Sequence, residues 1–378
     1  MKYLIIISSF KMGGGAERSV ALRTKELMND GHDVFLLTFY KEEDEYEYQA
    51  TDVICLNEKL VDNPISRLLK LFSRARMIKK IIKKLSPDVV VSYMEDSNFP
   101  LMLRRKRKDT KYIVNIRCFP SQQYRGFYGF VYKRMIKFLY PRADFVYVNS
   151  KMLKKDMVEN YKLKEERVVV KYNKIDLLKI YEKSNEEIEA LNQEMFEKNK
   201  IIINVGRFTQ DKGQDYLIKA FEIVQEKIPE AKLIFLGEGE YKKHIDTLLT
   251  FGISCFGNVK NPFKYMKQSK LFVFTSLTEG FPNVILESLA CGLPVISTDC
   301  YSGPREILAP DTDFSLKTHK AEYGKYGVLV PTFERNEDKG IEQRKIMLLA
   351  DVIIDMLENE EKRQEYSRKS IERAGDFR

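Results

Sequence analysis

The sequence predicts an α/β fold made of two doubly wound parallel sheets, and two observations support this prediction. Short apolar runs alternate with amphipathic helical segments along the chain, as in a parallel sheet covered by helices on both faces. A charged, glutamate-rich stretch at residues 182–200 interrupts the alternation, which then restarts. We therefore expect two Rossmann-like domains facing a central cleft, the first comprising residues 1–185 and the second residues 186–378.

The first domain opens with an apolar strand at residues 3–10, followed by a helix at residues 13–29 and a second strand at residues 32–40. Its remaining strands are short apolar runs separated by helical or loop segments. They comprise residues 87–93, 111–117, 144–150 and 167–173. The second domain repeats this order of strand and helix. Its strands comprise residues 201–208, 231–239, 271–276, 294–299 and 326–331.

Composition bounds the class of protein. With 378 residues, of which 44% are hydrophobic, the chain is long enough for two packed domains and too apolar to be disordered. Its five cysteines are scattered and form no C-x-x-C pair, which disfavours a disulfide framework or a zinc site and fits the reducing cytoplasm. No run approaches the roughly 18 apolar residues that a membrane-spanning helix needs. We therefore expect a cytoplasmic protein that does not cross a membrane.

Positive charge is concentrated in the first half of the sequence. Residues 1–183 contain 37 Lys and Arg against 23 Asp and Glu, a balance of +14, whereas the remainder has 27 against 32, a balance of −5. An anionic partner of the first half, such as a phosphate, a lipid headgroup or nucleic acid, would explain this asymmetry. A lysine-rich surface in contact with water explains it equally well. No nucleic-acid-binding module is recognisable, so we expect no nucleic acid among the partners.

Ligands of doubly wound folds lie at the carboxyl ends of the strands, so the residues that follow each strand are the candidates for a site. After the first strand, Gly13, Gly14 and Gly15 open a helix. Glycine lets the backbone approach a ligand and a helix N-terminus attracts anions, so we expect a phosphate or an anionic acceptor here. A tight turn without a ligand is the alternative. The spacing is not G-x-G-x-x-G, which disfavours a dinucleotide-dependent oxidoreductase.

Two cations follow the first strand of the second domain. Gly206 and Arg207 end that strand, and Lys212 lies further along the same loop. Both cations can converge on one diphosphate, Arg as a planar fork and Lys as a point charge. Cations held at a leaving diphosphate typically contribute roughly a few kcal/mol of transition-state stabilisation. The alternative is a pair of loop cations that face only water.

The segment TEGFPNVILE, at residues 278–287, places one glutamate before a helix and another inside it. We expect the helix to begin near Pro282, a residue type favoured in the first turn. Glu279 then lies in the preceding loop, and the amides of the first turn face any phosphate beside it. Glu287 can accept hydrogen bonds from a ribose diol. The alternative is that Glu279 caps the helix and Glu287 points to water.

Several segments together resemble a known family. They are GGGAERS, NVGRFTQDKGQDYLIKAF, LIFLGEGEY, FGNVKNPFKYMKQSKLFVFTS and TEGFPNVILESLACGLPVISTD. They are similar to the retaining glycosyltransferases of family 4, which have the two-domain GT-B fold. The resemblance spans nearly the whole chain and is strong over residues 201–308. It implies that the first domain binds the acceptor and that the second binds a nucleotide sugar, most often UDP-linked.

The resemblance also implies roles for single residues. Arg207 and Lys212 would bind the donor diphosphate and, with Glu279 at the donor sugar, form the catalytic set. Glu287 would bind the nucleotide ribose. Further donor contacts are implied at Gly206, at Asn258 and Val259 near the base, and along Gly280, Phe281, Pro282, Asn283 and Val284. The implied reaction transfers a hexosyl or N-acetylhexosaminyl group with retention, and it needs neither a metal ion nor another cofactor.

The sequence departs from the family at two places. Family members commonly carry a histidine after the strand at residues 111–117, where this sequence has Arg117. Arg cannot act as a proton switch at neutral pH, so we expect Arg117 to hold an anionic or hydroxyl-rich acceptor, unless the register differs. Members also usually end in a helix that crosses back onto the first domain, whereas this sequence stops at RAGDFR. We expect either that closure of the two domains is weaker than in the family or that the chain is trimmed at its C-terminus.

Basic, apolar segments of the first domain point to the acceptor. Residues 64–85 carry an apolar stripe that includes Leu69, Phe72 and Ile78. Residues 125–141 mix aromatic and basic side chains, and RRKRK at residues 104–108 adds further charge. The basic residues of the first segment are Arg67, Lys70, Arg74, Arg76, Lys79, Lys80, Lys83 and Lys84.

Basic amphipathic helices of this kind suit an anionic membrane surface or a pyrophosphate-bearing lipid. We expect peripheral attachment to the cytoplasmic face of the membrane. The expected acceptor is a polyprenyl-diphosphate-linked sugar or a growing lipopolysaccharide or capsule chain. SGPREIL, at residues 302–308, resembles transferases that build bacterial surface glycans. The alternatives are ordinary sheet-covering helices and, for the whole chain, a catalytically silent GT-B protein with an interaction role.

Overall fold

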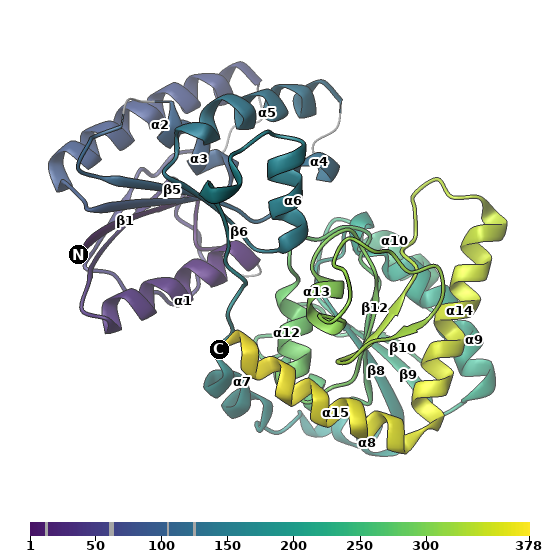
Figure 1. Cartoon of the computed structure of the whole chain (residues 1–378). Helices are drawn as coiled ribbons and strands as arrows, with labels where there is room; N and C mark the ends of the chain where they lie inside the picture. Colours follow the sequence, from purple (N-terminus) through teal and green to yellow (C-terminus); the bar gives the residue numbers. More distant parts are fainter. Residues whose placement is uncertain (12–13, 60–63, 104–105, 124–125) are drawn as a thin grey trace. The chain divides into compact units, whose positions relative to one another are not determined.

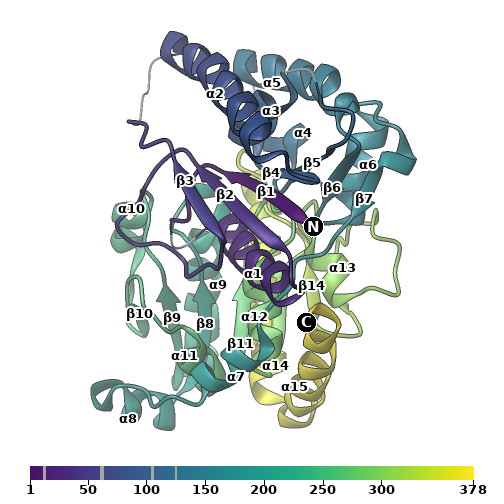
Figure 2. The ribbon, with the colours of Figure 1, turned by 90° about the vertical axis from the view of Figure 1, so that its left-hand side faces the viewer.

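The computed structural model describes residues 1–11, 14–59, 64–103, 106–123 and 126–378. The chain divides into two compact units, Met1–Lys174 and Ile175–Arg378. Each unit consists of a sheet with helices on both faces (Figures 1 and 2), so the predicted α/β class with two Rossmann-like domains is confirmed. The predicted boundary, between residues 185 and 186, falls within the second unit, where residues 175–185 pack.

In the described part of the first unit, seven parallel strands form one sheet in the order β3-β2-β1-β4-β5-β6-β7. The strands are β1 (Lys2–Ile7), β2 (Asp33–Thr38), β3 (Asp52–Cys55), β4 (Val89–Tyr93), β5 (Lys111–Ile116), β6 (Phe145–Val148) and β7 (Val168–Val170). The helices are α1 (Gly15–Asn29), α2 (Pro64–Leu85), α3 (Glu95–Met102), α4 (Pro120–Gln123), α5 (Gly126–Leu139) and α6 (Lys151–Glu159). Strand β3 was not among the predicted strands; it is an edge strand of only four residues, of which Asp52 and Val53 are exposed.

The two faces of the first sheet are covered by different helices. Along β1, Leu4 and Ile6 point into one core and Ile5 and Ile7 into the other, as the two-residue period of a strand requires. Helix α1 covers the second of these cores, whereas α2, α3, α5 and α6 cover the first (Figure 2). No described helix is long and apolar enough to span a bilayer.

The apolar residues of helix α2 divide between two environments. Ile78 is buried against the sheet, so this face of α2 is a sheet-covering face. Leu69 and Phe72 are exposed instead. Arg74, which the sequence analysis counted as part of the basic face, is buried, and its guanidinium forms an ion pair with Glu58 at 2.8 Å. The segments at Arg104 and at Arg125 lie partly outside the described residues.

The second unit repeats the plan of the first. Its sheet, within the described residues, has the order β10-β9-β8-β11-β12-β14-β13, with only β13 antiparallel to its neighbour. The strands are β8 (Lys200–Val205), β9 (Ala231–Leu236), β10 (Ile253–Cys255), β11 (Leu271–Phe274), β12 (Val295–Thr298), β13 (Glu322–Tyr323) and β14 (Val328–Val330). The helices are α7 (Leu177–Ser184), α8 (Ala190–Lys198), α9 (Gln214–Lys227), α10 (Lys242–Leu248), α11 (Phe263–Gln268), α12 (Asn283–Ala290), α13 (Pro304–Leu308), α14 (Lys339–Glu358) and α15 (Glu360–Ala374).

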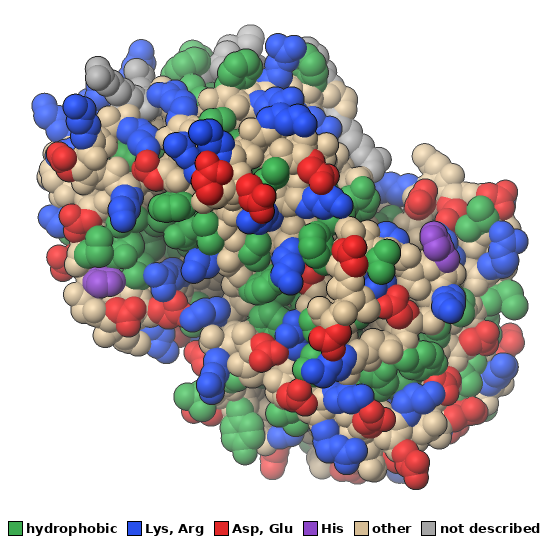
Figure 3. Space-filling view, viewed as in Figure 1, with side chains coloured by type: hydrophobic (Ala, Val, Ile, Leu, Met, Phe, Trp, Pro, Cys, Tyr) green, Lys and Arg blue, Asp and Glu red, His purple; other side chains and the backbone are tan. Residues whose placement is uncertain are grey.

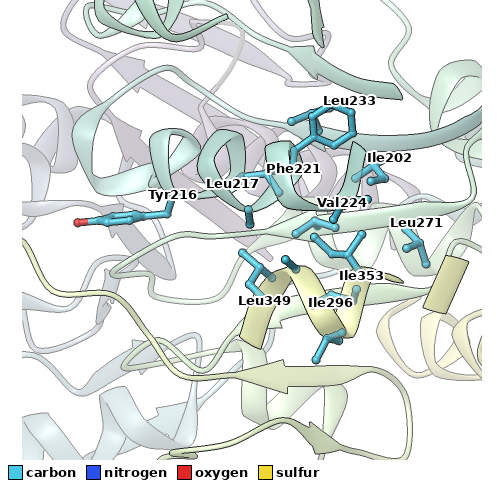
Figure 4. Packing of buried hydrophobic residues seen from close by; sticks show 14 of the residues in the cluster. Ile202, Tyr216, Leu217, Phe221, Val224, Leu233, Leu271, Ile296, Leu349 and Ile353 are labelled. Carbon is cyan, nitrogen blue, oxygen red and sulfur yellow. The ribbon is translucent and has the colours of Figure 1, made fainter. Parts of the chain in front are cut away.

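Helices α9 and α14 close one face of the second sheet (Figure 4). Phe221 and Val224 of α9 pack with Leu349 and Ile353 of α14, and all four side chains are fully buried. Burying such side chains contributes about 1.5–3 kcal/mol each. The opposite face is covered by α7, α8, α11, α12 and α13.

The strand order fixes where a ligand can bind in the second unit. Strand β8 lies between β9 and β11, so the chain leaves β8 toward one edge of the sheet and returns to fill the other. The loops after β8 and β11 therefore diverge at their carboxyl ends. This switch point is where open α/β sheets bind ligands, and it is the place where the predicted residues of the second domain should meet.

A buried carboxylate of the first unit gives a testable dependence on pH. Asp156 of α6 accepts hydrogen bonds at Oδ1 from Ser121 Oγ (2.6 Å) and from Asn160 Nδ2 (2.7 Å), while its buried Oδ2 has no hydrogen-bond partner. Burial raises the pKa of Asp156 above its ordinary value of 3.8, despite these hydrogen bonds. The folded state thus disfavours the ionised carboxylate.

We expect Asp156→Asn to raise the melting temperature relative to wild type increasingly as the pH rises from 4 to 8. A raised folded-state pKa means that the free energy of unfolding falls as pH rises from the unfolded pKa through the folded one. Asn cannot ionise, so the variant escapes this loss while keeping an oxygen for both donors. Thermal unfolding across this pH range measures the difference, and a difference that is independent of pH would contradict the expectation.

Candidate active site at the carboxyl edge of the second sheet

The loops that follow β8 and β11 lie against each other. Thr275 Oγ1 donates to the carbonyl oxygen of Lys212 at 3.1 Å, and the amide of Leu277 donates to the carbonyl oxygen of Asp211 at 2.8 Å. These hydrogen bonds join residues that are more than 60 positions apart in sequence. They fix the backbone that carries Lys212 beside the backbone that leads to Glu279.

A charged pair occupies this junction. The Lys212 ammonium contacts Glu279 Oε1 directly, and Ser276 Oγ donates to the same oxygen at 2.8 Å. The Lys212 ammonium also lies 5.8 Å from the ring centroid of Phe274. The Glu279 side chain is 15% exposed, so the pair is largely shielded from water but still reachable by a ligand. The helix-capping alternative for Glu279 is wrong, because α12 has no side-chain cap and Glu279 turns to Lys212 instead.

A glycine makes this approach possible. Gly213 adopts a φ of +61°, in the left-handed region, and a Cβ there would overlap the carbonyl oxygen of Thr275. The next residue, Gln214, is buried at the start of α9, and its Nε2 donates to the carbonyl oxygen of Arg207 at 3.1 Å. Gln214 thus ties the two ends of the loop together. The Arg207 side chain itself is exposed to solvent.

The loops after β9 and β10 extend the same edge. The amide of Gly206 donates to the carbonyl oxygen of Leu236 at 3.0 Å, and the amide of Gly237 donates to that of Gly257 at 2.8 Å. These bonds bring Gly206 and the segment with Asn258 and Val259 to one rim of the sheet. Asn258 is exposed there, whereas Val259 packs partly into the core.

We expect Gly237→Ala to destabilise the second unit by roughly 2–3 kcal/mol, because strained backbone and overpacking each cost about 1–3 kcal/mol. Gly237 has a φ of +147°, and a Cβ there would overlap the carbonyl oxygen of Gly206. Gly31 is the matched control, since its φ is +75° but nothing lies within 4 Å of its Cβ position. Denaturant unfolding of both variants measures the effect. Equal losses in the two variants would show that the close approach to Gly206 is unimportant.

The loop residues immediately before α12 are buried. Gly280, Phe281 and Pro282 are all buried, and the Phe281 ring lies 5.7 Å from the ring of Phe377 between centroids. Helix α12 begins at Asn283, immediately after Pro282, as predicted. The first amides of any α-helix lack partners within the helix. Because α12 begins in the loop after β11, its first N–H groups lie at the switch point.

Glu287 lies in the second turn of α12 and is only 5% exposed. The alternative that it points to water is therefore wrong. Glu287 and the C-cap residue Cys291 are four positions apart, about one helical turn. Burial first, and then the Glu287 carboxylate, raises the pKa of the Cys291 thiol to about 12. A buried carboxylate at this position is suited to hydroxyl groups of a ligand, because ionised carboxylates are hydrogen-bond acceptors only.

In the first unit, the glycine-rich loop is described only in part, because Gly13 lies outside the described residues. Gly14 precedes α1 and Gly15 is its first residue. A side chain at Gly14 would overlap the carboxylate of Glu17, which folds over the start of this helix. The chain thus places a carboxylate of its own beside the helix N-terminus at which an anion was expected.

Arg117 follows β5 directly, at the carboxyl edge of the first sheet, as predicted. Its guanidinium donates to Asn173 Oδ1 and lies 5.5 Å from the ring centroid of Tyr93. Burial lowers the pKa of Arg117 and raises that of the Tyr93 hydroxyl, which this guanidinium opposes. An acceptor role for Arg117 stays a prediction.

The sequence analysis did not identify three residues that support this site, namely Ser276, Gln214 and Gly237. All three follow strand ends or open the next helix, so their positions were available from the predicted strands. All three are uncharged, and each lies in a segment that carries the family resemblance without an individual role being implied for it.

Comparisons with known proteins show which family the chain is similar to. Residues 185–322 match the family model of glycosyl transferases group 1, and residues 13–178 match that of glycosyltransferase family 4. The chain is 38% identical over 361 residues to an uncharacterized glycosyltransferase of Methanocaldococcus jannaschii, covering 90% of this chain and 88% of that one. It is 32% identical over 375 residues to N-acetylgalactosamine-N,N'-diacetylbacillosaminyl-diphospho-undecaprenol 4-alpha-N-acetylgalactosaminyltransferase of Campylobacter jejuni, covering 96% and 92%.

Solved structures share the fold at lower identity. The Anabaena protein HepE in complex with UDP and glucose is similar with a TM-score of 0.74 and 18% identity, covering 100% of this chain and 95% of that one. The sucrose-phosphate synthase of Thermosynechococcus elongatus is similar with a TM-score of 0.77 and 17% identity, again covering 100% and 95%.

Proposed function

Because this chain belongs to glycosyltransferase family 4 and has the GT-B fold, we propose that it transfers a hexosyl or N-acetylhexosaminyl group from a UDP-sugar to a lipid-linked or polysaccharide acceptor. The transfer retains the anomeric configuration and uses neither a metal ion nor another cofactor. The observation that carries the proposal is the pair of Lys212 and Glu279 at the switch point.

Each group at this edge has a role in holding the donor. Lys212 and Arg207 neutralise the diphosphate, and the amides of residues 280–284 bind its oxygens together with the positive end of α12. Glu279 accepts from hydroxyl groups of the sugar, and Glu287 accepts from the ribose. The rim with Gly206, Asn258 and Val259 holds the base.

The proposed reaction needs no nucleophile from the protein. The bond between the sugar C1 and the diphosphate oxygen breaks, and its electron pair leaves with the diphosphate. The acceptor hydroxyl forms its bond to C1 on the same face, and its proton passes to the departing phosphate oxygen. Lys212 and Arg207 lower the barrier because they stabilise the charge that builds on the leaving group.

A thermal-shift screen of UDP-, GDP- and ADP-linked sugars tests the donor class. A ligand that binds only the folded state raises the melting temperature, so a UDP-sugar should raise it while the others do not. UDP is expected because HepE, which shares this fold, was crystallised with UDP and glucose. A response only to GDP or ADP would replace the donor class, and no response to any nucleotide sugar would contradict the transferase proposal.

The acceptor proposal draws on relatives and on the surface of the first unit. The name of the Campylobacter relative specifies an acceptor linked to diphospho-undecaprenol. Helices α2 and α5 both contact α3 on one face of the first sheet and expose apolar side chains as well as basic ones (Figure 3). The exposed apolar residues are Leu69, Phe72, Met77, Phe130, Val131 and Phe138. The exposed basic residues are Arg76, Lys79, Lys80, Lys83, Lys84, Lys133, Arg134 and Lys137.

This surface of α2 and α5 is suited to the headgroup region of an anionic bilayer. Leu69 is 65% and Phe138 is 73% exposed, so both can enter the bilayer without unpacking the core. Each Lys near an anionic membrane contributes about 1 kcal/mol. We propose that the protein binds peripherally to the cytoplasmic face of the membrane through this surface, where a polyprenyl-diphosphate-linked acceptor is available.

Sedimentation with vesicles tests this attachment. Replacing Lys79, Lys80, Lys83 and Lys84 with Gln should reduce binding to vesicles of phosphatidylglycerol at least tenfold, with no effect on vesicles of phosphatidylcholine. A variant with Gln at Lys198, Lys227, Lys243 and Lys320 removes the same charge from exposed positions of the second unit and is the control. Equal losses in both variants would show that net charge, and not this surface, drives binding.

A further inference from the structure

The turn between β12 and α13, at residues 299–303, lies directly against the loop before α12. Ser302 Oγ donates to the carbonyl oxygen of Gly280 at 2.7 Å. A Cβ on Gly303 would lie 2.5 Å from Pro282 Cδ and 3.0 Å from Phe281 Cα. Ser302 and Gly303 are both buried. The backbone of residues 280–282 therefore has no room to shift toward this turn.

A conformational requirement accompanies this contact. Gly303 has a φ of +96°, which side chains other than glycine rarely adopt. The turn is thus built for a close approach of two backbones, one of which continues into the first amides of α12.

A buried ion-pair network anchors the turn. Arg305, the second residue of α13, is 2% exposed, and its guanidinium donates to Asp299 Oδ2 at 2.6 Å and to Glu322 Oε2 at 2.8 Å. Its NH1 group also donates to Thr312 Oγ1 at 3.0 Å. Asp299 is buried as well and accepts from the amide of Thr318 at 2.8 Å. Arg305 thereby joins the two ends of the turn to β13 and to the segment before it.

The Arg305 guanidinium is fully engaged within the protein. Of its two carboxylate partners, Asp299 begins the turn and Glu322 belongs to β13, and all five of its N–H donors have acceptors. Buried ion pairs contribute little net stability once desolvation is counted, but they hold a fixed geometry. Arg305 is thus a support of the turn and is not available to bind a phosphate.

We propose that Ser302 and Gly303 are positioning residues of the donor site, held in place by Arg305, and that they fix the amides of residues 280–284 against the donor diphosphate. This role rests on the proposed function, since it requires that those amides bind the donor. Amides aimed in advance at a developing charge stabilise the transition state without reorganising, and a displacement of about 1 Å can cost about 100-fold in rate. The turn is therefore expected to affect turnover beyond its effect on stability.

The test compares two serines that make the same kind of hydrogen bond. Ser370 of α15 is also fully buried and donates to a backbone carbonyl, that of Leu293, at 3.1 Å, but Leu293 lies before the amino end of β12, away from the site. Ser302→Ala and Ser370→Ala each remove one buried hydroxyl, so both should lower the melting temperature by about 2–4 °C. We expect Ser302→Ala alone to lower kcat at least tenfold and to weaken UDP binding at least threefold by calorimetry. Ser370→Ala should change both by less than twofold.

A second pair of variants tests the same role in case Ser302→Ala does not fold. Glu322→Gln weakens the anchor of Arg305 at a side chain that is 30% exposed, and Glu342→Gln removes the carboxylate of a remote pair with Lys219 at a side chain that is 25% exposed. Glu322→Gln should lower kcat at least threefold, whereas Glu342→Gln should not. If wild type binds UDP and each site variant behaves like its control, the positioning role is overturned and the proposed function stands. If wild type binds no nucleotide sugar, both are overturned.

Discussion

Replacing Lys212 with Met should lower kcat by roughly 100-fold to 1,000-fold while leaving the fold intact, because removal of one preorganised group at a developing charge typically costs that much. Met retains most of the aliphatic length that packs near Phe274 but cannot stabilise the leaving diphosphate. The Glu279 carboxylate also loses its cation, so part of the loss will reflect a displaced Glu279. Steady-state kinetics with the donor identified by the thermal-shift screen measures the change.

Lys219→Met is the matched control for Lys212→Met. Lys219 also pairs with a glutamate, Glu342, at 2.7 Å, and its ammonium lies 5.6 Å from the ring centroid of Tyr216. It sits on α9, outside the loops of the switch point. We expect kcat of this variant to stay within twofold of wild type. Similar losses in the two lysine variants would remove Lys212 from the catalytic set.

Glu279→Gln should lower kcat by roughly 100-fold and leave the affinity for UDP unchanged or slightly higher, since UDP lacks the sugar that Glu279 is proposed to contact. Gln preserves the shape of the side chain and can still accept from Ser276 Oγ, so the loop should keep its conformation. Removing this negative charge also frees Lys212 for the diphosphate. Turnover and UDP calorimetry on the same preparation separate catalysis from binding.

The same variant separates the two functions considered for this chain. A catalytically silent interaction protein would tolerate Glu279→Gln without losing its role, whereas a transferase loses turnover and keeps its fold. Glu342→Gln again serves as the control for loss of an ion pair. Turnover of Glu279→Gln within threefold of wild type would contradict the proposed role of Glu279.

The fold was predictable because its signal is local. Strand periods, helix periods and the residues at strand ends can be read over about ten residues, and these local patterns are enough to place Arg207, Lys212 and Glu279 in the loops at strand ends. The beginning of α12 next to Pro282 was predicted for the same reason. Edge strand β3 was missed because its apolar run, VICL at residues 53–56, is too short to distinguish a strand from a loop.

The partners of side chains were not predictable in the same way. Lys212 and Glu279 are 67 positions apart, and only the packing of β8 next to β11 brings their charges into contact. Arg74 has the sequence context of a surface cation, but the structure buries it against Glu58, because helix rotation on the sheet decides which face is covered.

The sequence by itself determined a family 4 glycosyltransferase with two parallel-sheet domains, since the alternation of strands and helices and the motifs at strand ends are properties of contiguous residues. Only the tertiary structure decided that Glu279 pairs with Lys212, that Glu287 is buried and that the turn with Ser302 and Gly303 supports the loop before α12. The physical reason is that hydrogen bonds, ion pairs and burial depend on distances between atoms of different strands and loops. Those distances exist only once the sheet has assembled.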